Sequence, residues 1–254
     1  MIKGLDVFKK YFSDYNDQYV LIGGAACDIV FNEVNAEFRP TRDFDVVLIV
    51  EALTPEFGKR LWEFIEEGGY ENRLKSDGSA QFYRFDKPKS PDFPFMIELF
   101  ARTESVFDDD PHTCRRISLG DELTSLSAIL LNSDYYQLLL TGKTVMSDLS
   151  ILPDVYLILF KAKAWLNLTE ARAAGLEVKG SDIRKHKNDV ARLAALLTGT
   201  ETCAVPESIL ADLSFLAEAF ESDPPNFASL NLAGVTVDDI LATLSTVYKQ
   251  AEIE

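Results

Sequence analysis

Residues 19–50 read YVLIGGAACDIVFNEVNAEFRPTRDFDVVLIV and bring a glycine pair and two closely spaced aspartates together in one short unit. Residues 19–22 form an apolar, partly β-branched run typical of a buried strand, and a helical pattern begins at Gly23 and Gly24. Glycine lets the backbone approach a ligand closely, and the N–H groups of a first helical turn favour a phosphate. The unit therefore predicts a strand, a glycine turn and a helix suited to a nucleotide phosphate.

The second half of this unit begins with Asp43 and Asp45, which open a predicted strand that continues to Val50. Side chains two positions apart on a strand project from the same face, roughly 6.6 Å apart along the strand. Two such carboxylates can bind one divalent ion. They can also simply cap a strand and a turn, which is common for an isolated Asp-x-Asp pair. The glycine turn before them and the apolar strand after them favour the metal site.

A third carboxylate follows in the apolar strand FMIELFA, residues 95–101. Glu98 is the only charged residue there, and an ionised carboxylate in a buried strand costs several kcal/mol unless a cation pairs with it. On the residues alone, Glu98 fits a metal site and a half-exposed edge strand equally well. With the two aspartates upstream, we expect Glu98 to join them in one site.

These features resemble the nucleotidyltransferase fold of the polymerase-β superfamily, and within it the AbiEii toxin-like branch. The resemblance rests on a glycine pair followed by the pattern Arg-x-Thr-x-Asp-x-Asp, here Gly23, Gly24, Arg39, Thr41, Asp43 and Asp45. It implies that the glycine turn binds the triphosphate of an NTP and that Asp43 and Asp45 bind Mg²⁺. It also implies that Glu98 is the third metal-binding carboxylate or the base.

Other candidate nucleotide-binding residues lie outside the carboxylate set. Arg39 and Thr41 carry a guanidinium and a hydroxyl that could orient a phosphate, or they are loop residues without a role. Farther along, Lys161 and Lys163 lie two apart on a predicted helix and cannot point the same way, so we expect one to reach solvent and the other a cleft. The resemblance favours Lys161 for a phosphate contact.

The next predicted helix holds the run Lys185-His186-Lys187-Asn188-Asp189. This run is similar to the Lys-Asp-x-x-Asp run of the toxin-like relatives, with His186 in place of the first aspartate. Lys185 and Asp189 are therefore candidate nucleotide-binding residues. A solvated basic helix face is an equally good interpretation.

The predicted fold class is α/β: a nucleotidyltransferase-like mixed-sheet lobe over residues 1–135, followed by a helical lobe over residues 136–254. A chain of 254 residues with 47% hydrophobic side chains is long enough for two compact lobes. Helices are expected over residues 3–16, 54–67, 150–168, 181–197, 206–220 and 237–249, and further strands over residues 70–75, 81–86 and 95–101.

The formal net charge is −16, and residues 201–254 supply −9 of it, from ten acids against one lysine. A field of this sign repels nucleic acid and anionic membranes, which argues against RNA as a partner. A local basic strip could overrule the net charge; its members would be Arg172, Lys179, Arg184, Lys185 and Lys187.

Three widely spaced cysteines without a CxxC pair indicate a reducing compartment, so we expect the protein in the cytoplasm. No uncharged run approaches the ~20 residues of a membrane span, and the N-terminus lacks the apolar core of a signal peptide, so no membrane partner is expected. The sequence contains no GxSxG, GxxxxGK[ST] or HExxH motif, which excludes the commoner rival catalytic signatures.

The sequence therefore predicts an enzyme that uses Mg²⁺ to move a nucleoside monophosphate from an NTP to an acceptor hydroxyl, with Asp43, Asp45 and Glu98 as its catalytic residues. The acceptor stays open between a small molecule such as an aminoglycoside, a protein side chain and an RNA 3′ end. The alternative is a protein of the same fold without the reaction, which binds nucleotide or pairs with an antitoxin-like protein.

Overall fold

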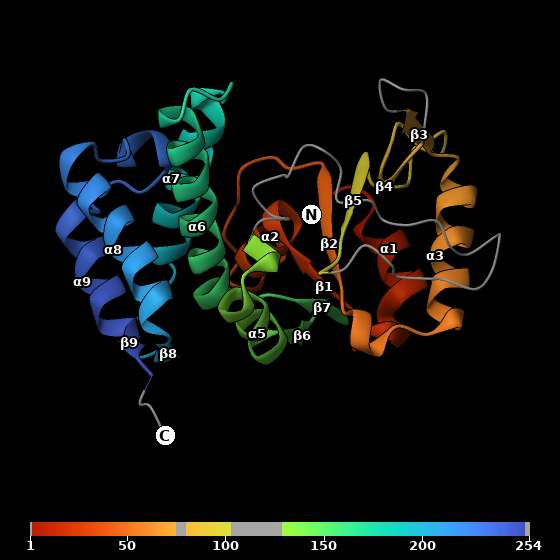
Figure 1. The fold of residues 1–254 in the computed structure, drawn as a ribbon, viewed down its shortest axis with the longest axis horizontal. Helices are drawn as coiled ribbons and strands as arrows, with labels where there is room; N and C mark the ends of the chain where they lie inside the picture. Colours follow the sequence, from red (N-terminus) through yellow and green to blue (C-terminus); the bar gives the residue numbers. More distant parts are fainter. Residues whose placement is uncertain (1, 75–79, 103–128, 252–254) are drawn as a thin grey trace. The chain divides into compact units, whose positions relative to one another are not determined.

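The computed structural model describes residues 2–74, 80–102 and 129–251. In these ranges the strands form a seven-stranded mixed sheet, in the order β3-β4-β5-β2-β1-β7-β6, and a separate parallel pair, β8-β9 (Figure 1). The prediction of an α/β chain with a mixed sheet is confirmed. The strands of the larger sheet are β1 (Tyr19–Ile22), β2 (Asp43–Leu48), β3 (Glu71–Leu74), β4 (Ala80–Asp86), β5 (Met96–Phe100), β6 (Thr144–Met146) and β7 (Leu149–Ile151).

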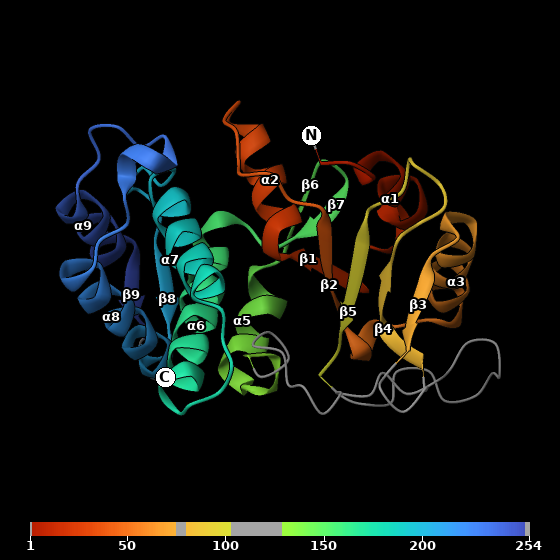
Figure 2. The same ribbon diagram turned by 90° about the horizontal axis from the view of Figure 1, so that it is seen from above.

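Helices cover the central strands of this sheet from two sides. Helices α1 (Leu5–Phe12) and α3 (Pro55–Gly68) lie on one side of β2 and β5, and α2 (Gly23–Glu33) lies on the other (Figures 1 and 2). The alternation of side chains along β2 matches this arrangement. Phe44 points towards α1, where its ring centroid lies 5.3 Å from that of Phe8, so the aspartates on either side of Phe44 point to the opposite face.

Aromatic side chains fill the space between the sheet and helices α1 and α3. Phe8, Phe12 and Phe64 are each at most 2% exposed, and their ring centroids lie 4.5–5.8 Å apart. Each large ring removes on the order of 150–250 Å² from water, so this cluster contributes strongly to stability. The amphipathic helix expected over residues 3–16 is confirmed in α1, which continues into a 3-10 turn at Ser13–Tyr15.

Helix α3 begins and ends at the signals that the sequence contains. The Thr54 hydroxyl accepts a hydrogen bond from the Phe57 N–H at 3.3 Å, and Pro55 occupies the first turn. At the other end, Gly69 adopts a left-handed φ of 61° and its N–H donates to the carbonyl of Glu66. A second 3-10 turn, Val50–Ala52, precedes this helix.

By its internal contacts the chain divides into two compact units, one of residues 1–130 with 142–153 and one of residues 131–141 with 154–254. The sequence-based boundary between residues 135 and 136 falls inside α5 (Ser133–Gly142), so it differs from this division. The reason is the hairpin of β6 and β7, which returns to the sheet after α5: Ile151 of β7 pairs in parallel with Leu21 of β1.

The helical unit contains α6 (Asp154–Ala173), α7 (Gly180–Ala194), α8 (Glu207–Ser222), a 3-10 turn at Phe227–Leu230 and α9 (Val237–Val247). The helix predicted from Ser150 is wrong at its start, because residues 149–151 form β7 and α6 begins only after Pro153. The interpretation of the back half as helical throughout is wrong as well. Strand β8 (Cys203–Val205) pairs with β9 (Tyr248–Gln250), so the last predicted helix stops at Val247.

The helices in the described ranges include none that is both long and apolar enough to cross a membrane.

Candidate functional site

The glycine turn at the start of α2 lies directly against two of the predicted site residues. Gly23 has a left-handed φ of 67°, and a Cβ at this position would lie 1.8 Å from Oδ2 of Asp45. A Cβ at Gly24 would lie 2.3 Å from the hydroxyl oxygen of Thr41. Both distances are far below van der Waals contact, so only glycine allows the backbone to approach these side chains so closely. The turn therefore borders the aspartate strand.

The register of the sheet places the three predicted carboxylates near one another. Asp45 of β2 pairs with Ile22 of β1 on one side and with Glu98 of β5 on the other. Paired residues of neighbouring strands face the same side of a sheet at a spacing of ~4.8 Å, and Asp43 shares that side because it lies two residues away. Asp43, Asp45 and Glu98 are all partly exposed on this face, which is the face opposite Phe44.

Glu98 has a cationic partner that the sequence analysis missed. Arg84 of β4 pairs in register with Glu98, and its Nε donates to Oε1 of Glu98 at 2.5 Å, with Nη2 on the same oxygen. The sequence did hold a signal. The sequence predicts strands over residues 81–86 and 95–101, and the apolar Phe85 beside Arg84 indicates that the arginine points to the polar face.

These residues suit a magnesium ion bound together with a nucleotide. Mg²⁺ prefers carboxylate oxygens and is commonly held by one or two carboxylates plus water and substrate phosphates, rather than by an all-protein cage. Asp43 and Asp45 supply two such carboxylates on one face. Within the ranges that the structure describes, no group of three His, Cys, Asp or Glu side chains converges as a metal site would require. Asp43 and Asp45 could therefore hold the ion only together with other ligands, such as water and phosphate oxygens.

Thr41 and Arg39 take different positions beside this strand. The Thr41 hydroxyl lies against Gly24, so it joins the glycine turn and Asp45 in one neighbourhood. The Arg39 guanidinium lies 5.0 Å from the ring centroid of Phe38, a distance suited to a cation–π contact, and its side chain is half-buried. The structure thus brings Thr41 to the turn, whereas a phosphate contact of Arg39 stays a prediction.

In the helical unit, two of the three candidate nucleotide-binding residues bond to each other. Nζ of Lys161 on α6 lies 3.1 Å from Oδ2 of Asp189 on α7, and the two side chains are 6% and 0% exposed. Arg192 approaches the other oxygen of Asp189 at 3.5 Å. Lys185 is exposed on α7. A phosphate contact of Lys161, Lys185 or Asp189 stays a prediction.

Lys163 points away from Lys161, as the helical spacing predicts, but neither lysine extends into solvent. Nζ of Lys163 lies 2.8 Å from Oδ1 of Asp212 on α8, and the hydroxyl of Tyr135 donates to Oδ2 of the same carboxylate. Burial and the Asp212 charge raise the pKa of Tyr135 far above its ordinary value, so this phenol stays protonated. The α6 lysines therefore tie this helix to its neighbours.

The predicted basic strip is only partly present. Arg172, Lys179, Arg184 and Lys185 are exposed. Lys187 is buried, and its ammonium group bonds to the carboxylate of Asp223 at 2.6 Å, which lowers the pKa of that carboxyl group. The strip is correspondingly shorter than the sequence indicates.

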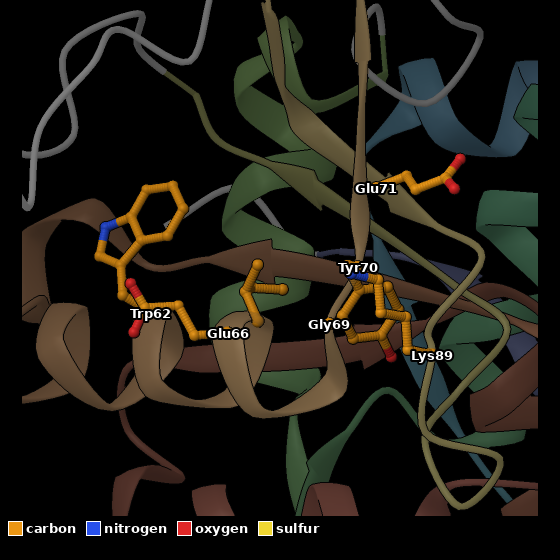
Figure 3. A pocket seen from close by; sticks show the side chains of 7 residues that line it. Trp62, Glu66, Gly69, Tyr70, Glu71 and Lys89 are labelled. Carbon is orange, nitrogen blue, oxygen red and sulfur yellow. The ribbon is translucent and has the colours of Figure 1, made fainter.

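A pocket of about 470 Å³ lies at the C-terminal end of α3, with Trp62 and Glu66 at one end and Tyr70 and Lys89 at the other (Figure 3). It does not belong to the carboxylate site. The Trp62 ring stands edge-on to that of Phe85 at 5.9 Å, and Phe85 points to the opposite face of β4 from its neighbour Arg84. The pocket and the carboxylates are therefore on opposite sides of the sheet.

Comparison with known proteins identifies no relative. No protein-family model matches the chain. No curated protein and no solved structure matches it either.

Proposed function

We propose that the chain is a Mg²⁺-dependent nucleotidyltransferase, which moves a nucleoside monophosphate from an NTP to an acceptor hydroxyl and releases pyrophosphate. The site would lie on the acidic face of β2, beside the start of α2. The reaction belongs to a class in which positioning and electrostatic stabilisation of the phosphates provide most of the rate acceleration.

One observation carries the proposal: the glycine turn and the Asp45 carboxylate lie against each other. The residue before α2 is Ile22, whose apolar side chain cannot cap the helix, so it leaves the N–H groups of the first turn to other acceptors. A helix N-terminus binds phosphate, and a carboxylate beside it can hold the cation that accompanies a triphosphate. The two elements that a metal–nucleotide complex requires are therefore adjacent.

The residues of the glycine turn and of the aspartate strand have distinct roles in this proposal. The bound Mg²⁺ would neutralise charge on the triphosphate and orient the attacking hydroxyl. Asp43 and Asp45 hold the ion with their carboxylates. The backbone of Gly23 and Gly24 approaches the phosphates, and the Thr41 hydroxyl adds a neutral donor at the same turn.

Three kinds of acceptor fit the proposal: a small molecule, a protein side chain and an RNA 3′ end. The negative charge of the chain makes RNA the least favoured, and the exposed part of the basic strip is short. An antitoxin-like protein partner and a cytoplasmic location belong to the same proposal.

The ion pair of Arg84 and Glu98 favours a second candidate function. Three carboxylates close together argue for catalysis, because like charges destabilise a fold that has no bound metal to offset them. Arg84 gives one of the three a permanent counter-ion, which weakens that argument. The second candidate is therefore a protein of this fold that binds a nucleotide or a protein partner without catalysis.

Transfer of label from nucleotides tests the reaction. The protein is incubated with Mg²⁺ and each of the four NTPs, labelled either at the α- or at the γ-phosphate, together with a cell lysate fractionated into small molecules, protein and RNA. Nucleotidyl transfer moves the α-label and not the γ-label into one fraction, and Asp45→Asn abolishes it. If no α-label moves although the wild type binds Mg²⁺ and NTP, the second candidate is the correct one.

A further inference from the structure

Arg84 bonds to one of the predicted carboxylates and has no role in the proposal so far. Its Nε and Nη2 both donate to Oε1 of Glu98, and the two side chains are 26% and 12% exposed. Within the described residues, Arg84 makes no other hydrogen bond, and neither does Oε2 of Glu98. One oxygen of the carboxylate is thus engaged, and most of the guanidinium donors are available.

The arginine belongs to the same row of side chains as the proposed metal ligand. Across three adjacent strands, Asp45 pairs with Glu98 and Glu98 pairs with Arg84, so all three face one side of the sheet. Buried Asp86 lies two residues beyond Arg84 and faces the same side. The guanidinium of Arg84 therefore lies at one end of this row, and Asp45, beside the glycine turn, lies at the other.

We propose that Arg84 binds a phosphate oxygen of the NTP and that Glu98 positions it, rather than acting as the third metal ligand. This inference rests on the proposed function. A guanidinium has five N–H donors in a fixed planar fork that matches carboxylate and phosphate oxygens. Two donors bind Glu98 and fix the orientation of the fork, and three remain for an anion.

The charges of the row argue for the same assignment. Oε2 of Glu98 is left over, but the positive charge of Arg84 on Oε1 of the same carboxylate opposes a divalent ion beside it. A polyphosphate has the opposite requirement, because it needs positive charge on the side away from the metal. Arg84 supplies that charge, about two strand spacings, or ~10 Å, from Asp45 along the row.

Separate titrations of metal and nucleotide distinguish the two assignments. Mn²⁺ binding is measured by electron paramagnetic resonance without nucleotide, and binding of each NTP with Mg²⁺ is measured by calorimetry. Arg84→Gln should leave the Mn²⁺ affinity at or above that of the wild type and should lower the affinity for the NTP about 10- to 100-fold, the value of a charged hydrogen bond. Glu98→Gln should keep the Mn²⁺ affinity and lower the NTP affinity about threefold to tenfold, whereas Asp45→Asn should lose Mn²⁺.

Two further variants serve as controls. Arg84→Lys keeps the charge and the pair with Glu98 but loses the planar fork, so it should fold like the wild type and still bind NTP about tenfold more weakly. Lys59→Gln removes one positive charge from an exposed position on α3, where the side chain is 78% exposed, and should change neither titration.

The assignment is overturned if both Arg84 variants bind NTP as tightly as the wild type, or if Glu98→Gln loses Mn²⁺ as completely as Asp45→Asn does. If the wild type itself binds both Mn²⁺ and NTP, either of these outcomes leaves the proposed function intact. A wild type that binds neither overturns the proposed function, and the role of Arg84 with it.

Discussion

Replacing Gly23 by alanine places a methyl group where the glycine turn meets the aspartate strand. The new Cβ would lie 1.8 Å from Oδ2 of Asp45 and 2.8 Å from its Cγ, so the carboxylate has to rotate away from the turn. The variant also forces a non-glycine residue into a left-handed φ of 67°, which costs about 1–2 kcal/mol. We expect both a loss of stability and a loss of the proposed metal site.

Gly69→Ala separates these two effects within the same unit. Gly69 has a similar φ of 61°, but the nearest atoms to its added Cβ belong to the flexible side chain of Lys89, at 3.1–3.2 Å. Both variants should therefore lose a similar amount of stability from the backbone. For a chain of this size, each 1 kcal/mol lowers the melting temperature by roughly 2–4 °C. Only Gly23→Ala displaces Asp45.

Calorimetric melting and titration with Mn²⁺ in the presence of NTP measure the two effects. Gly23→Ala should melt below Gly69→Ala, because the clash with Asp45 adds to the shared backbone cost, and it should bind Mn²⁺ at least about tenfold more weakly, since one of two carboxylate ligands moves. Gly69→Ala should bind Mn²⁺ like the wild type. Equal Mn²⁺ affinity in all three proteins would refute the reasoning that the turn and the carboxylate form one site.

Three further predictions concern the helical unit. Asp189→Ala removes the carboxylate that pairs with the buried ammonium of Lys161, so it should lower the free energy of unfolding by about 3–5 kcal/mol in urea titrations. Lys185→Ala, at an exposed position, should change this free energy by less than about 0.5 kcal/mol. Similar losses for the two variants would contradict the buried pair. Burial raises the pKa of the Cys203 thiol from 9.0 to about 11. Because the pKa in the folded state is the higher one, the stabilising contribution of the neutral thiol is fully present below pH 9 and is lost as the pH rises to about 11. Alkylation of Cys203 in the native protein, measured by peptide mass mapping, should therefore be slow at pH 8. Rapid alkylation at that pH would show that the site opens. Thr236→Ala removes the hydroxyl that accepts from the N–H of Asp239 at the start of α9, and should cost about 1 kcal/mol in the same urea titration, while Thr236→Ser should cost little; equal effects of the two would argue against the cap.

Local signals in the sequence predicted local structure well. The glycine turn, the strand that contains Asp45 and the ends of α3 each depend on residues within a few positions of one another, so their outcome could be derived from the chain in order. The shared face of Asp43 and Asp45 follows from strand geometry alone. These parts of the candidate site needed no knowledge of the fold.

Pairing between distant segments could not be derived in the same way. The bond between Arg84 and Glu98 depends on the register of β4 against β5, and a shift of one residue would have turned Arg84 to the other face. Strands β6 and β7 have three residues each, which is too short for a periodic pattern, so the hairpin that moves the unit boundary was missed. The burial of Lys161 depends on Asp189, 28 residues away on another helix.

The central claim is that Asp43 and Asp45, beside the glycine turn, hold a metal–nucleotide complex. Calorimetric titration of NTP into the wild type and Asp45→Asn, with and without Mg²⁺, tests it most directly. The account predicts that the wild type binds at least one NTP and that this binding requires Mg²⁺. It also predicts that Mg²⁺ no longer raises the NTP affinity of Asp45→Asn. A wild type that binds no NTP, or an Asp45→Asn variant that binds it with the same affinity and the same Mg²⁺ dependence, would contradict the account.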